Sequence, residues 1–427
     1  MKVLVAGGGA SGMVAAIVAS RNGHEVTVLE HKDRLGKKIL ATGNGRCNLS
    51  NSLLKDNPGQ YYRNIEGDSK ACDFINDLFA VFSYDDTIAF FESIGLWVKE
   101  KGTLMYPYSE QAGAVLDVLR FALRDLGINV VTDCNTKDIR KMNSGEFEIT
   151  ALISKYDDKT KKTKLSEETV KYVADRVIIA TGSKAQPKLG ADGSGYSLLR
   201  KMGHTITCVT PALVQLIAQK DKGQDIFKSL AGVRTHAIIE LCMDNKTVAE
   251  EEGELQLTAY GISGIGVMNL TTYLGNADQN ISVNVDLAPE YTEDKLYSML
   301  RNRCYQMPDR RSEELLIGFL PKKLAEAMLK LSDIGFTTKY SDISEDKLKK
   351  LVRCIKRWKI DIEGTNTFDD AQICMGGLPV DELKDTLESR MVQGLYVAGE
   401  IIDAHGPCGG FNLQQAWSTG AVAGMLK

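Results

Sequence analysis

The sequence predicts an α/β protein: a Rossmann-like domain that carries an inserted region of antiparallel strands and helices. Three observations lead to this fold class. A glycine-rich turn joins an apolar strand to a helix at the start of the chain, a short apolar strand and a glycine-led helix stand at its end, and segments of alternating hydrophobicity lie between them. The 427 residues, 43% of them apolar and 25% charged, are enough for two or three packed units.

The first 30 residues form a strand, a glycine turn, a helix and a second strand in direct succession. Gly7, Gly9 and Gly12 fit the pattern G-x-G-x-x-G, and Ala10 and Ser11 begin the helix. In this pattern the first glycine allows the tight turn, the second lets backbone approach a pyrophosphate, and the third lets the helix lie close to the strand. Phosphate then lies at the helix N-terminus, where free N–H groups and the helix dipole favour an anion. Dinucleotide binding is therefore favoured over a purely structural turn.

The second strand ends at Glu30, which His31 follows. Gly23 is expected to end the helix in a left-handed conformation before that strand. A carboxylate at this position accepts from the 2′-hydroxyl of a ribose and repels a 2′-phosphate, so FAD or NAD is favoured over NADP.

Arg34 and Lys37 come next and are expected to contact the cofactor, and a loop rich in small residues follows them. Small residues let main chain approach a flat ring closely, although composition alone equally allows a solvated loop with two ordinary turns. If the loop lies against the cofactor, the residues expected to contact it are Thr42, Gly43, Asn44, Gly45, Arg46 and Cys47.

The motif GKKILATGNGRCN after the glycine turn, and the C-terminal segment from GGLPVDELKD to NLQQAWSTGAVAG, resemble the BaiN-like family of NAD(P)/FAD-dependent oxidoreductases. The resemblance runs from residue 1 to 427, with dense motifs at both ends and a vaguer middle. It implies a glutathione-reductase-like FAD-binding domain. It also implies reduction of enone double bonds in steroid and bile-acid intermediates, or oxidation of amines of the aminoacetone type.

The resemblance assigns cofactor contacts near the C-terminus as well. The strand GLYVAGE ends at Gly399 and Glu400, and Glu400 is expected near the ribityl and pyrophosphate groups. A helix led by glycine is expected to present its amides to the pyrimidine edge of the flavin, where they would stabilise the reduced ring. These amides belong to Gly410, Phe411, Asn412 and Leu413. The strand ADRVIIATGS resembles the ATG turn of two-dinucleotide flavoproteins and is expected to leave the FAD domain beside the cofactor at Ala180, Thr181 and Gly182. The segment LRDLGINVVTDC ahead of it is expected to run beside the adenine, with Val131 offering a backbone contact.

The middle of the chain is expected to be an insertion. The predicted FAD domain comprises residues 1–190 and 361–427, and residues 191–360 are predicted to form a β-barrel-like and helical substrate or cap domain. The segments 235–242, 253–261 and 280–289 alternate like antiparallel strands. Residues 292–304, 312–331 and 344–358 have helical spacing, and the basic run LKKLVRCIKRWK favours a solvated helix face over a polyanion site.

Two residues are candidates for proton transfer. His405 is the only one of five histidines inside a motif, and a hydrogen-bonded loop histidine is as good an interpretation as a general acid. Tyr260 lies in a segment similar to the family's Thr-x-x-Gly-x-Ser-Gly element, in which Ser263 suits an N-cap, and a structural role is favoured for this tyrosine. Ala259 replaces the His or acidic residue of many members, so no role is carried over to it.

Composition disfavours several classes of function. Lys and Arg number 52 against 56 Asp and Glu, so a net charge of −4 gives no basic field for nucleic acid. Nine scattered cysteines without a C-x-x-C pair suit reduced cytosolic thiols, and disfavour a disulfide reductase or a zinc or other metal site. Cys47 and Cys408 are therefore expected to be packing groups. The early first strand leaves no room for a signal peptide and no apolar run suits a membrane helix, so a cytoplasmic location is expected.

A flavin must take a hydride and pass it on, yet only one dinucleotide fingerprint is present. We therefore expect NAD(P)H to visit the flavin pocket transiently, after which N5 delivers hydride to an activated C=C bond of a steroid-like or bile-acid-like small molecule. The alternatives are an amine oxidase that uses O2 and a flavin-binding redox sensor without turnover. The oligomeric state stays open.

Overall fold

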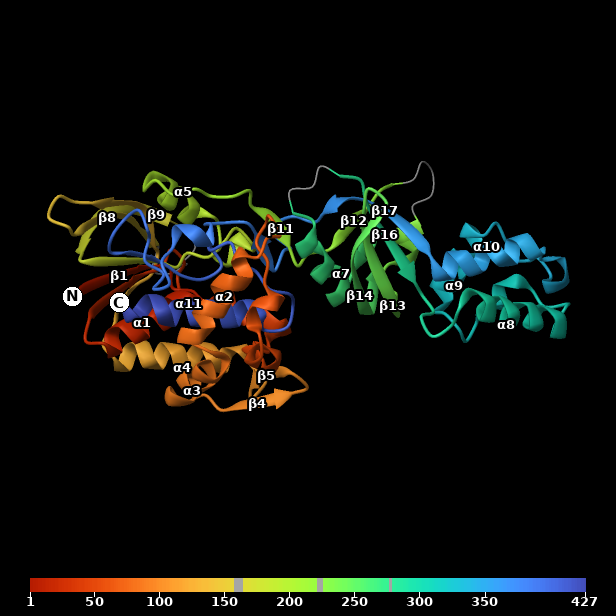
Figure 1. Cartoon of the computed structure of the whole chain (residues 1–427), viewed down its shortest axis with the longest axis horizontal. Coiled ribbons are helices and arrows are strands. Elements are labelled where there is room, and N and C mark those ends of the chain that lie inside the picture. The colour runs from red at the N-terminus through yellow and green to blue at the C-terminus, as the bar shows by residue number, and fades with distance from the viewer. Residues whose placement is uncertain (157–163, 221–225, 276–278) are drawn as a thin grey trace. The chain divides into compact units, whose positions relative to one another are not determined.

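The computed structural model describes residues 1–156, 164–220, 226–275 and 279–427 (Figure 1). The chain forms two compact units. The first contains Met1–Pro211 and Ala371–Lys427, and the second contains Ala212–Asp370.

These boundaries differ from the predicted ones at residues 190 and 360. Residues 191–211 belong to the first unit because helix α5 (Ser194–Lys201) packs there: a Cβ on Gly195 would lie 2.0 Å from Thr181 Oγ1. Residues 361–370 belong to the second unit because strand β17 (Trp358–Thr365) is part of its barrel.

A five-stranded parallel sheet forms the centre of the first unit, in the order β19-β10-β1-β2-β6. The chain starts at β1, adds β2 and β6 on one side, and then returns to add β10 and β19 on the other. The order therefore reverses between β1 and β10, and in open α/β sheets ligands bind at such a reversal, beyond the carboxyl ends of the strands. The predicted α/β class is confirmed. The strands are β1 (Lys2–Ala6), β2 (Glu25–Leu29), β6 (Asn129–Val131), β10 (Arg176–Ile179) and β19 (Leu395–Val397).

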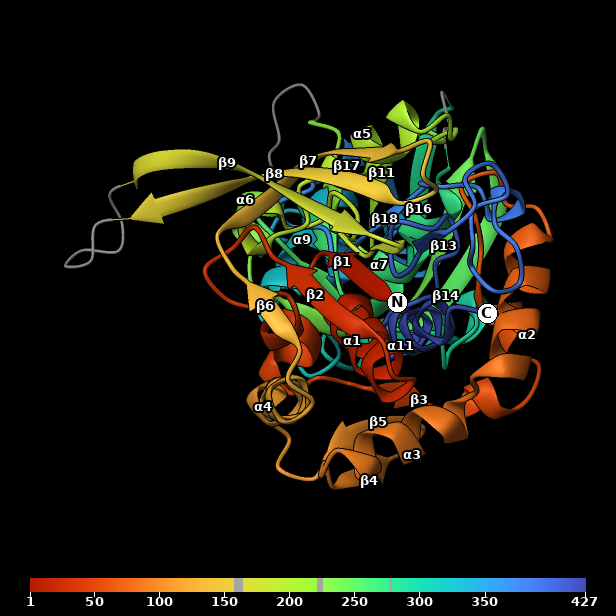
Figure 2. The same cartoon turned by 90° about the vertical axis from the view of Figure 1, so that its left-hand side faces the viewer.

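Two helices from opposite ends of the chain lie side by side on one face of this sheet: α1 (Ala10–Arg21) and α11 (Phe411–Met425) (Figure 2). Glycines on α11 make this close approach possible. A Cβ on Gly420 would lie 2.4 Å from the Ser11 carbonyl oxygen, and one on Gly424 would lie 2.5 Å from that of Ala15. The first and last helices thus share one core.

An antiparallel sheet covers the other face, formed by β7 (Cys134–Lys141), β8 (Phe147–Tyr156) and β9 (Lys164–Ala174) (Figure 2). Helix α4 (Ala112–Asp125) packs against α1 and buries Leu116, Leu119 and Leu123, whose spacing places them on one helix face. The other elements of this part of the fold are β3 (Ser50–Asn51), α2 (Lys70–Val81), α3 (Tyr84–Ser93), β4 (Val98–Lys101), β5 (Leu104–Pro107), β11 (Thr210–Ala212) and β18 (Ile373–Met375).

The second unit contains a closed barrel in the order β12-β15-β14-β13-β16-β17, which confirms the predicted antiparallel insertion. Ser263 does not cap a helix, because it ends β15 and Gly264 is the N-cap of the next helix. The remaining elements are β12 (Leu216–Ala218), α6 (Ile226–Leu230), β13 (Arg234–Met243), β14 (Lys246–Leu257), β15 (Gly261–Ser263), α7 (Ile265–Leu270) and β16 (Ile281–Asp286).

Three helices complete the second unit: α8 (Glu293–Gln306), α9 (Lys322–Leu331) and α10 (Glu345–Lys356) (Figure 1). The hydroxyls of Thr292 and Ser344 cap α8 and α10 by accepting backbone N–H groups. The helix expected over 312–331 is shorter, because Pro321 stands at its N-cap and Ser312–Glu314 form a separate 3-10 turn. Within the described ranges, no helix is both long enough and apolar enough to span a membrane.

Candidate functional site

The glycine turn lies where the strand order reverses. Gly7 has φ +108°, and a Cβ there would lie 2.4 Å from the Ala180 carbonyl oxygen at the end of β10. A Cβ on Gly12 would lie 1.9 Å from the Gly7 carbonyl oxygen, so only glycine lets α1 approach the turn this closely. A Cβ on Gly9 would meet nothing within 4 Å, which leaves open space at the start of α1. The backbone there is accessible to a phosphate, beside Ala10 and Ser11.

Glu30 lies at the end of β2 and is 7% exposed. Its Oε2 accepts from the Gly8 amide at 2.9 Å, and its Oε1 accepts from the Lys32 amide at 2.8 Å. Each carboxylate oxygen has a second lone pair, so both can also accept a ribose hydroxyl. The backbone N–H of Glu30 donates to the Val131 carbonyl at 2.9 Å, which fixes β6 beside this position.

His31 lies beside Glu30, with Nδ1 3.3 Å from Glu30 Oε1. Its Nε2 is buried without a hydrogen-bond partner in the described part of the chain, and it lies 4.0 Å from Asp192 Oδ2. Burial raises the pKa of Asp192. Hydrogen bonds from Ser194 and the electrostatic effect of His31 outweigh burial and hold this pKa below its ordinary value. An unpartnered buried nitrogen beside the ribose-binding carboxylate suits a further polar group from a ligand.

Arg34 and Lys37, the two cations predicted to contact the cofactor, do not share the buried surroundings of Glu30. Arg34 is exposed, and Lys37 forms an ion pair with Asp33, four residues earlier in the chain. The adjacent Lys38 is the residue that links the two ends of the chain: its Nζ lies 2.7 Å from Glu400 Oε2. The sequence does not single out Lys38, because a Lys-Lys pair does not show which side chain faces inward.

Glu400 follows Gly399, whose φ is +88° and whose Cβ would lie 2.3 Å from Ser11 Oγ. Besides Lys38, the carboxylate of Glu400 accepts from Ser183 Oγ at 2.6 Å and from the Cys374 amide at 3.2 Å. Burial, together with Glu400 nearby, raises the pKa of the Cys374 thiol to about 11. Glu400 thus joins three segments at the end of the parallel sheet.

The ATG turn after β10 also faces this region. Ala180 is buried, and Gly182 has φ +73°. Thr181 Oγ1 is buried and has no hydrogen-bond partner among the described residues. A hydroxyl in this state suits a ligand contact, since buried polar atoms are nearly always hydrogen-bonded.

The loop after Lys38 has an unusual backbone. Gly43, Asn44, Gly45 and Cys47 all have positive φ, and Gly43 to Arg46 are exposed. Thr42 Oγ1 donates to the Ile39 carbonyl at 2.6 Å. Burial raises the pKa of the Cys47 thiol to about 12, which suits a packing group. The loop presents main chain outward, as a flat ring stacked on it would require.

The N-terminus of α11 is held against this same part of the chain. Gly410 has φ +96°, and a Cβ there would lie 2.6 Å from the Ser50 carbonyl oxygen and 3.0 Å from Asn48 Oδ1. Asn48 Oδ1 is buried and unpartnered in the described ranges. Trp417 Nε1 donates to the Leu49 carbonyl at 3.0 Å. Asn48 was not among the predicted site residues, although it stands next to the small-residue loop.

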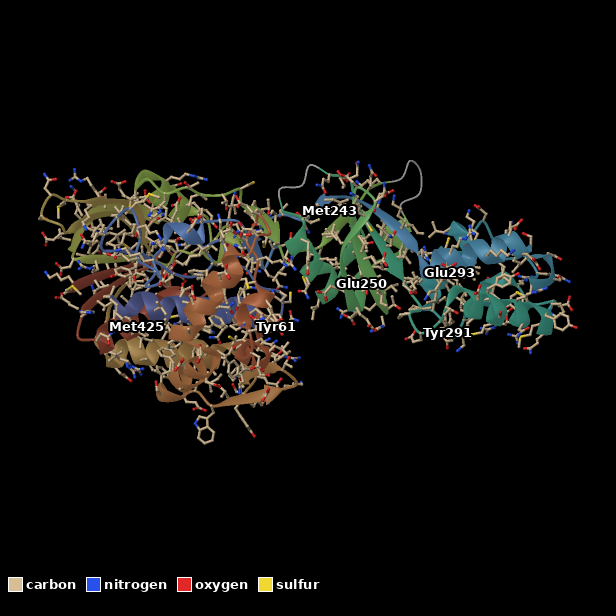
Figure 3. All side chains as sticks on the ribbon, in the orientation of Figure 1. Tyr61, Met243, Glu250, Tyr291, Glu293 and Met425 are labelled. Atoms are coloured by element: carbon tan, nitrogen blue, oxygen red, sulfur yellow. The ribbon has the colours of Figure 1, made fainter. Side chains whose placement is uncertain are left out.

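The first residues of α11 divide between packing and site positions. Phe411 packs on Tyr61, with ring centroids 5.0 Å apart, and Figure 3 labels this tyrosine. The Asn412 side chain accepts from the Gly406 amide and donates to the Gly406 carbonyl, so it holds the preceding loop. Leu413 is half-buried. Side chains therefore fix the helix start, which leaves its backbone amides for a ligand.

His405 is buried, at 1% exposure. Its Nε2 donates to the Gly376 carbonyl at 3.2 Å and lies 3.4 Å from Asp403 Oδ1. Asp403 in turn accepts from the amides of Ile65 and Gly376 and from Thr207 Oγ1. This network joins the C-terminal loop to three other segments, and a role for His405 as a general acid remains a prediction.

Tyr260 belongs to the second unit. Its side chain is 42% exposed, which differs from the buried structural tyrosine that was favoured, and its hydroxyl lies 3.5 Å from Asn366 Nδ2. A role in proton transfer remains a prediction for this residue as well.

The residues of the first unit fit a dinucleotide. Open backbone at Gly9, a fixed carboxylate at Glu30, and unpartnered buried atoms on His31, Asn48 and Thr181 follow the carboxyl edge of the sheet. The described ranges contain no cluster of His, Cys, Asp and Glu suited to a metal ion.

Comparison with known proteins agrees with this geometry. The family model described as HI0933-like protein Rossmann domain matches residues 1–426. A 3-dehydro-bile acid delta(4,6)-reductase of Clostridium scindens is 39% identical over 99% of this chain and 98% of its own. A ribosomal RNA dihydrouridine synthase of Escherichia coli is 27% identical over 97% of this chain and 95% of its own. The resemblance found in the sequence motifs is confirmed.

Solved structures support the fold. The FrdA chain of Escherichia coli quinol fumarate reductase superposes with a TM-score of 0.50 at 14% identity, covering 99% of this chain and 69% of that one. At this identity the similarity concerns the fold alone.

Proposed function

Because the chain belongs to the HI0933-like family, a family of flavin oxidoreductases, we propose that it binds FAD and uses NAD(P)H to reduce a C=C bond conjugated to a carbonyl group. The convergence of the two ends of the chain carries this proposal. The glycine turn after β1, the loop after Lys38 and the N-terminus of α11 meet within one unit, joined by the 2.7 Å contact between Lys38 and Glu400.

Each part of FAD has matching residues. The amides at Gly9, Ala10 and Ser11 would bind the pyrophosphate at the start of α1, and Glu30 would accept the adenosine ribose hydroxyls. His31 and Val131 would border the adenosine. Thr181, Lys38 and Glu400 would contact the ribityl region, and the loop 42–47 together with the amides at the start of α11 would hold the ring.

When bound, the flavin would supply the redox chemistry by taking a hydride from NAD(P)H and passing it to the acceptor. The chain must then orient the acceptor, exclude water and provide a proton. The free amides and the positive dipole end at the N-terminus of α11 favour negative charge at the edge of the ring. An enone acceptor also needs a donor at its carbonyl oxygen, where negative charge develops.

A steroid-like or bile-acid-like enone is the first candidate substrate. The 39% identical relative is named for the reduction of 3-dehydro-bile acids, and the similarity covers nearly both chains. We propose the second unit as the substrate domain, with the barrel and the three helices supplying residues that select the acceptor. His405 and Tyr260 stay as candidates for proton transfer, with His405 better suited to position the loop through Asp403.

The uracil ring of RNA is a second candidate acceptor. The 27% identical relatives in Escherichia coli and Haemophilus influenzae are named for the synthesis of dihydrouridine in ribosomal RNA. The bond reduced in uridine is also a C=C bond conjugated to a carbonyl, so the same hydride chemistry would serve both acceptors. A small-molecule acceptor and an RNA acceptor therefore differ in how they are recognised and share the redox step.

Anaerobic mixing tests the proposal. FAD-loaded protein should lose its visible flavin absorption when NADH or NADPH is added, and should regain it when a steroid enone is added without oxygen. Bleaching by an amine but not by NAD(P)H would replace the proposal with an oxidase. Bleaching by neither would leave a flavin-binding redox sensor.

A further inference from the structure

Charge is distributed unevenly along this chain. Residues 293–359, which contain α8, α9 and α10, carry sixteen Lys and Arg against ten Asp and Glu, a net charge of +6 in a chain of −4. The excess is densest over residues 345–359, with seven basic residues against two acidic ones. A clustered basic surface is the electrostatic signature of a nucleic-acid-binding face. The charge of the whole chain conceals this cluster.

Helix α10 turns its apolar face inward and its basic face outward. Leu348, Leu351 and Ile355 are buried in the core of the second unit. Lys350 and Arg353 are exposed on the opposite side. Since the apolar face is already occupied, this helix has no free hydrophobic surface to insert into a lipid layer, which favours a soluble polyanion over a membrane.

A pocket of about 280 Å³ opens beside the basic face. Its wall includes four cationic side chains, Lys350, Arg353, Arg357 and Lys359, and one carboxylate, Asp361. Phe227 and Trp358 also line it and stack on each other, with ring centroids 6.0 Å apart and an interplanar angle of 14°. A concave site lined by guanidinium and ammonium groups suits a phosphate group.

Among the described residues, three of these cations have an acidic partner and Arg353 has none. Lys350 pairs with Asp333, Lys359 pairs with Asp361 at 3.1 Å, and Arg357 Nε lies 3.1 Å from Glu293, which Figure 3 labels at the start of α8. Arg353 forms no ion pair with any acid in the described part of the chain. Its five N–H donors are therefore available to an incoming phosphate.

We propose that α10 and this pocket form an RNA-binding surface, with a phosphate of the strand bound by Arg353. The inference goes beyond the reductase proposal, because the surface lies wholly within the second unit and needs no flavin. It would serve an RNA acceptor directly, and it would give a small-molecule reductase a second binding function.

Fluorescence anisotropy with a labelled single-stranded oligouridine tests the inference on the FAD-loaded full chain. The unchanged protein should bind at low salt and release the RNA as salt increases. Arg353→Glu should weaken binding by about tenfold or more, because it removes a phosphate contact and adds a repulsive charge. Arg124→Glu is the matched control: Arg124 has an exposed side chain in the first unit, and its replacement makes the same charge change.

Three results would overturn the inference: no RNA binding at low salt, equal weakening by the two charge reversals, or binding to anionic vesicles with the same dependence on Arg353. Arg353→Gln provides a second variant if Arg353→Glu fails to fold. A protein that reduces enones but ignores RNA would overturn this inference alone, while RNA binding without enone reduction would leave it standing.

Discussion

Lys38 Nζ lies 2.7 Å from Glu400 Oε2, although 362 residues separate them along the chain. Both side chains are mostly buried, with 25% and 17% exposure. The contact joins the segment that follows β2 to the segment that leads into α11.

Breaking this contact should weaken FAD binding. Glu400→Gln leaves the Lys38 ammonium without its charge partner, and Lys38→Met leaves the carboxylate with only neutral donors. We expect each change to reduce FAD affinity by about 10- to 100-fold, or 1.4 kcal/mol per tenfold, in a fluorescence titration of apoprotein. Lys201→Met is the matched control, since Lys201 forms a surface ion pair with Asp138 in the first unit, and equal losses in all three variants would contradict the assignment.

Gly12→Ala should damage the fold and the cofactor site together. The added methyl would lie 1.9 Å from the Gly7 carbonyl oxygen, so α1 must move away from the glycine turn. A loss of about 1–3 kcal/mol in the free energy of unfolding is expected from such overpacking, with release of FAD. Gly113→Ala, in the first turn of α4, should be neutral or stabilising, because a Cβ at this half-buried position would meet nothing within 4 Å. Retention of FAD by Gly12→Ala would show that the turn is not the phosphate site.

Glu388 should contribute a pH-dependent part of the stability. Burial raises its pKa, but bonds from Lys384 and the Gly394 amide outweigh burial and hold the pKa below 4.5. Since the folded-state pKa is depressed, the stabilisation is present above pH 4.5 and is lost as pH falls through the folded-state value. Glu388→Gln should therefore cost about 1 kcal/mol at neutral pH and progressively less in acid, measured by urea unfolding.

The control for this measurement is Glu254→Gln, which removes an exposed ion pair with Arg234. Such a pair contributes about 0–1 kcal/mol. The unchanged protein and Glu388→Gln should differ in free energy of unfolding by an amount that depends on pH. A difference that stays constant with pH would contradict the proposed linkage.

Cys47 should be chemically inert. Burial raises its thiol pKa to about 12, so almost no thiolate exists at neutral pH. N-ethylmaleimide should label the exposed Cys208 first and leave Cys47 unmodified, as followed by mass spectrometry of the folded protein. Cys47→Ser should keep the rate of flavin reduction, and a large loss of that rate would instead indicate a redox role for this thiol.

Local patterns in the sequence predicted much of the cofactor site. The spacing of Gly7, Gly9 and Gly12 and the position of Glu30 depend on neighbouring residues, so both could be placed before the structure. The glycine-led α11 and the antiparallel strands were likewise found from their local periodicity.

Long-range contacts could not be predicted in this way. Only the fold shows that Lys38 rather than Lys37 reaches Glu400, or that His405 is buried against Gly376. The observed domain boundaries differ from the predicted ones because α5 and β17 pack against partners that are distant in the chain. The basic run of α10 is visible in the sequence, where it favours a solvated helix face, but the pocket beside it and the pairing of its cations appear only in the structure.

The most direct test of a single FAD site built by both ends of the chain is a calorimetric titration. FAD is added to apoprotein that has been shown to refold after its cofactor is removed. One FAD per chain should bind to the unchanged protein, and both Gly12→Ala and Glu400→Gln should weaken that binding, because opposite ends of the chain build one site. A folded protein that binds no FAD, or one that binds it equally well with either end altered, would contradict the account.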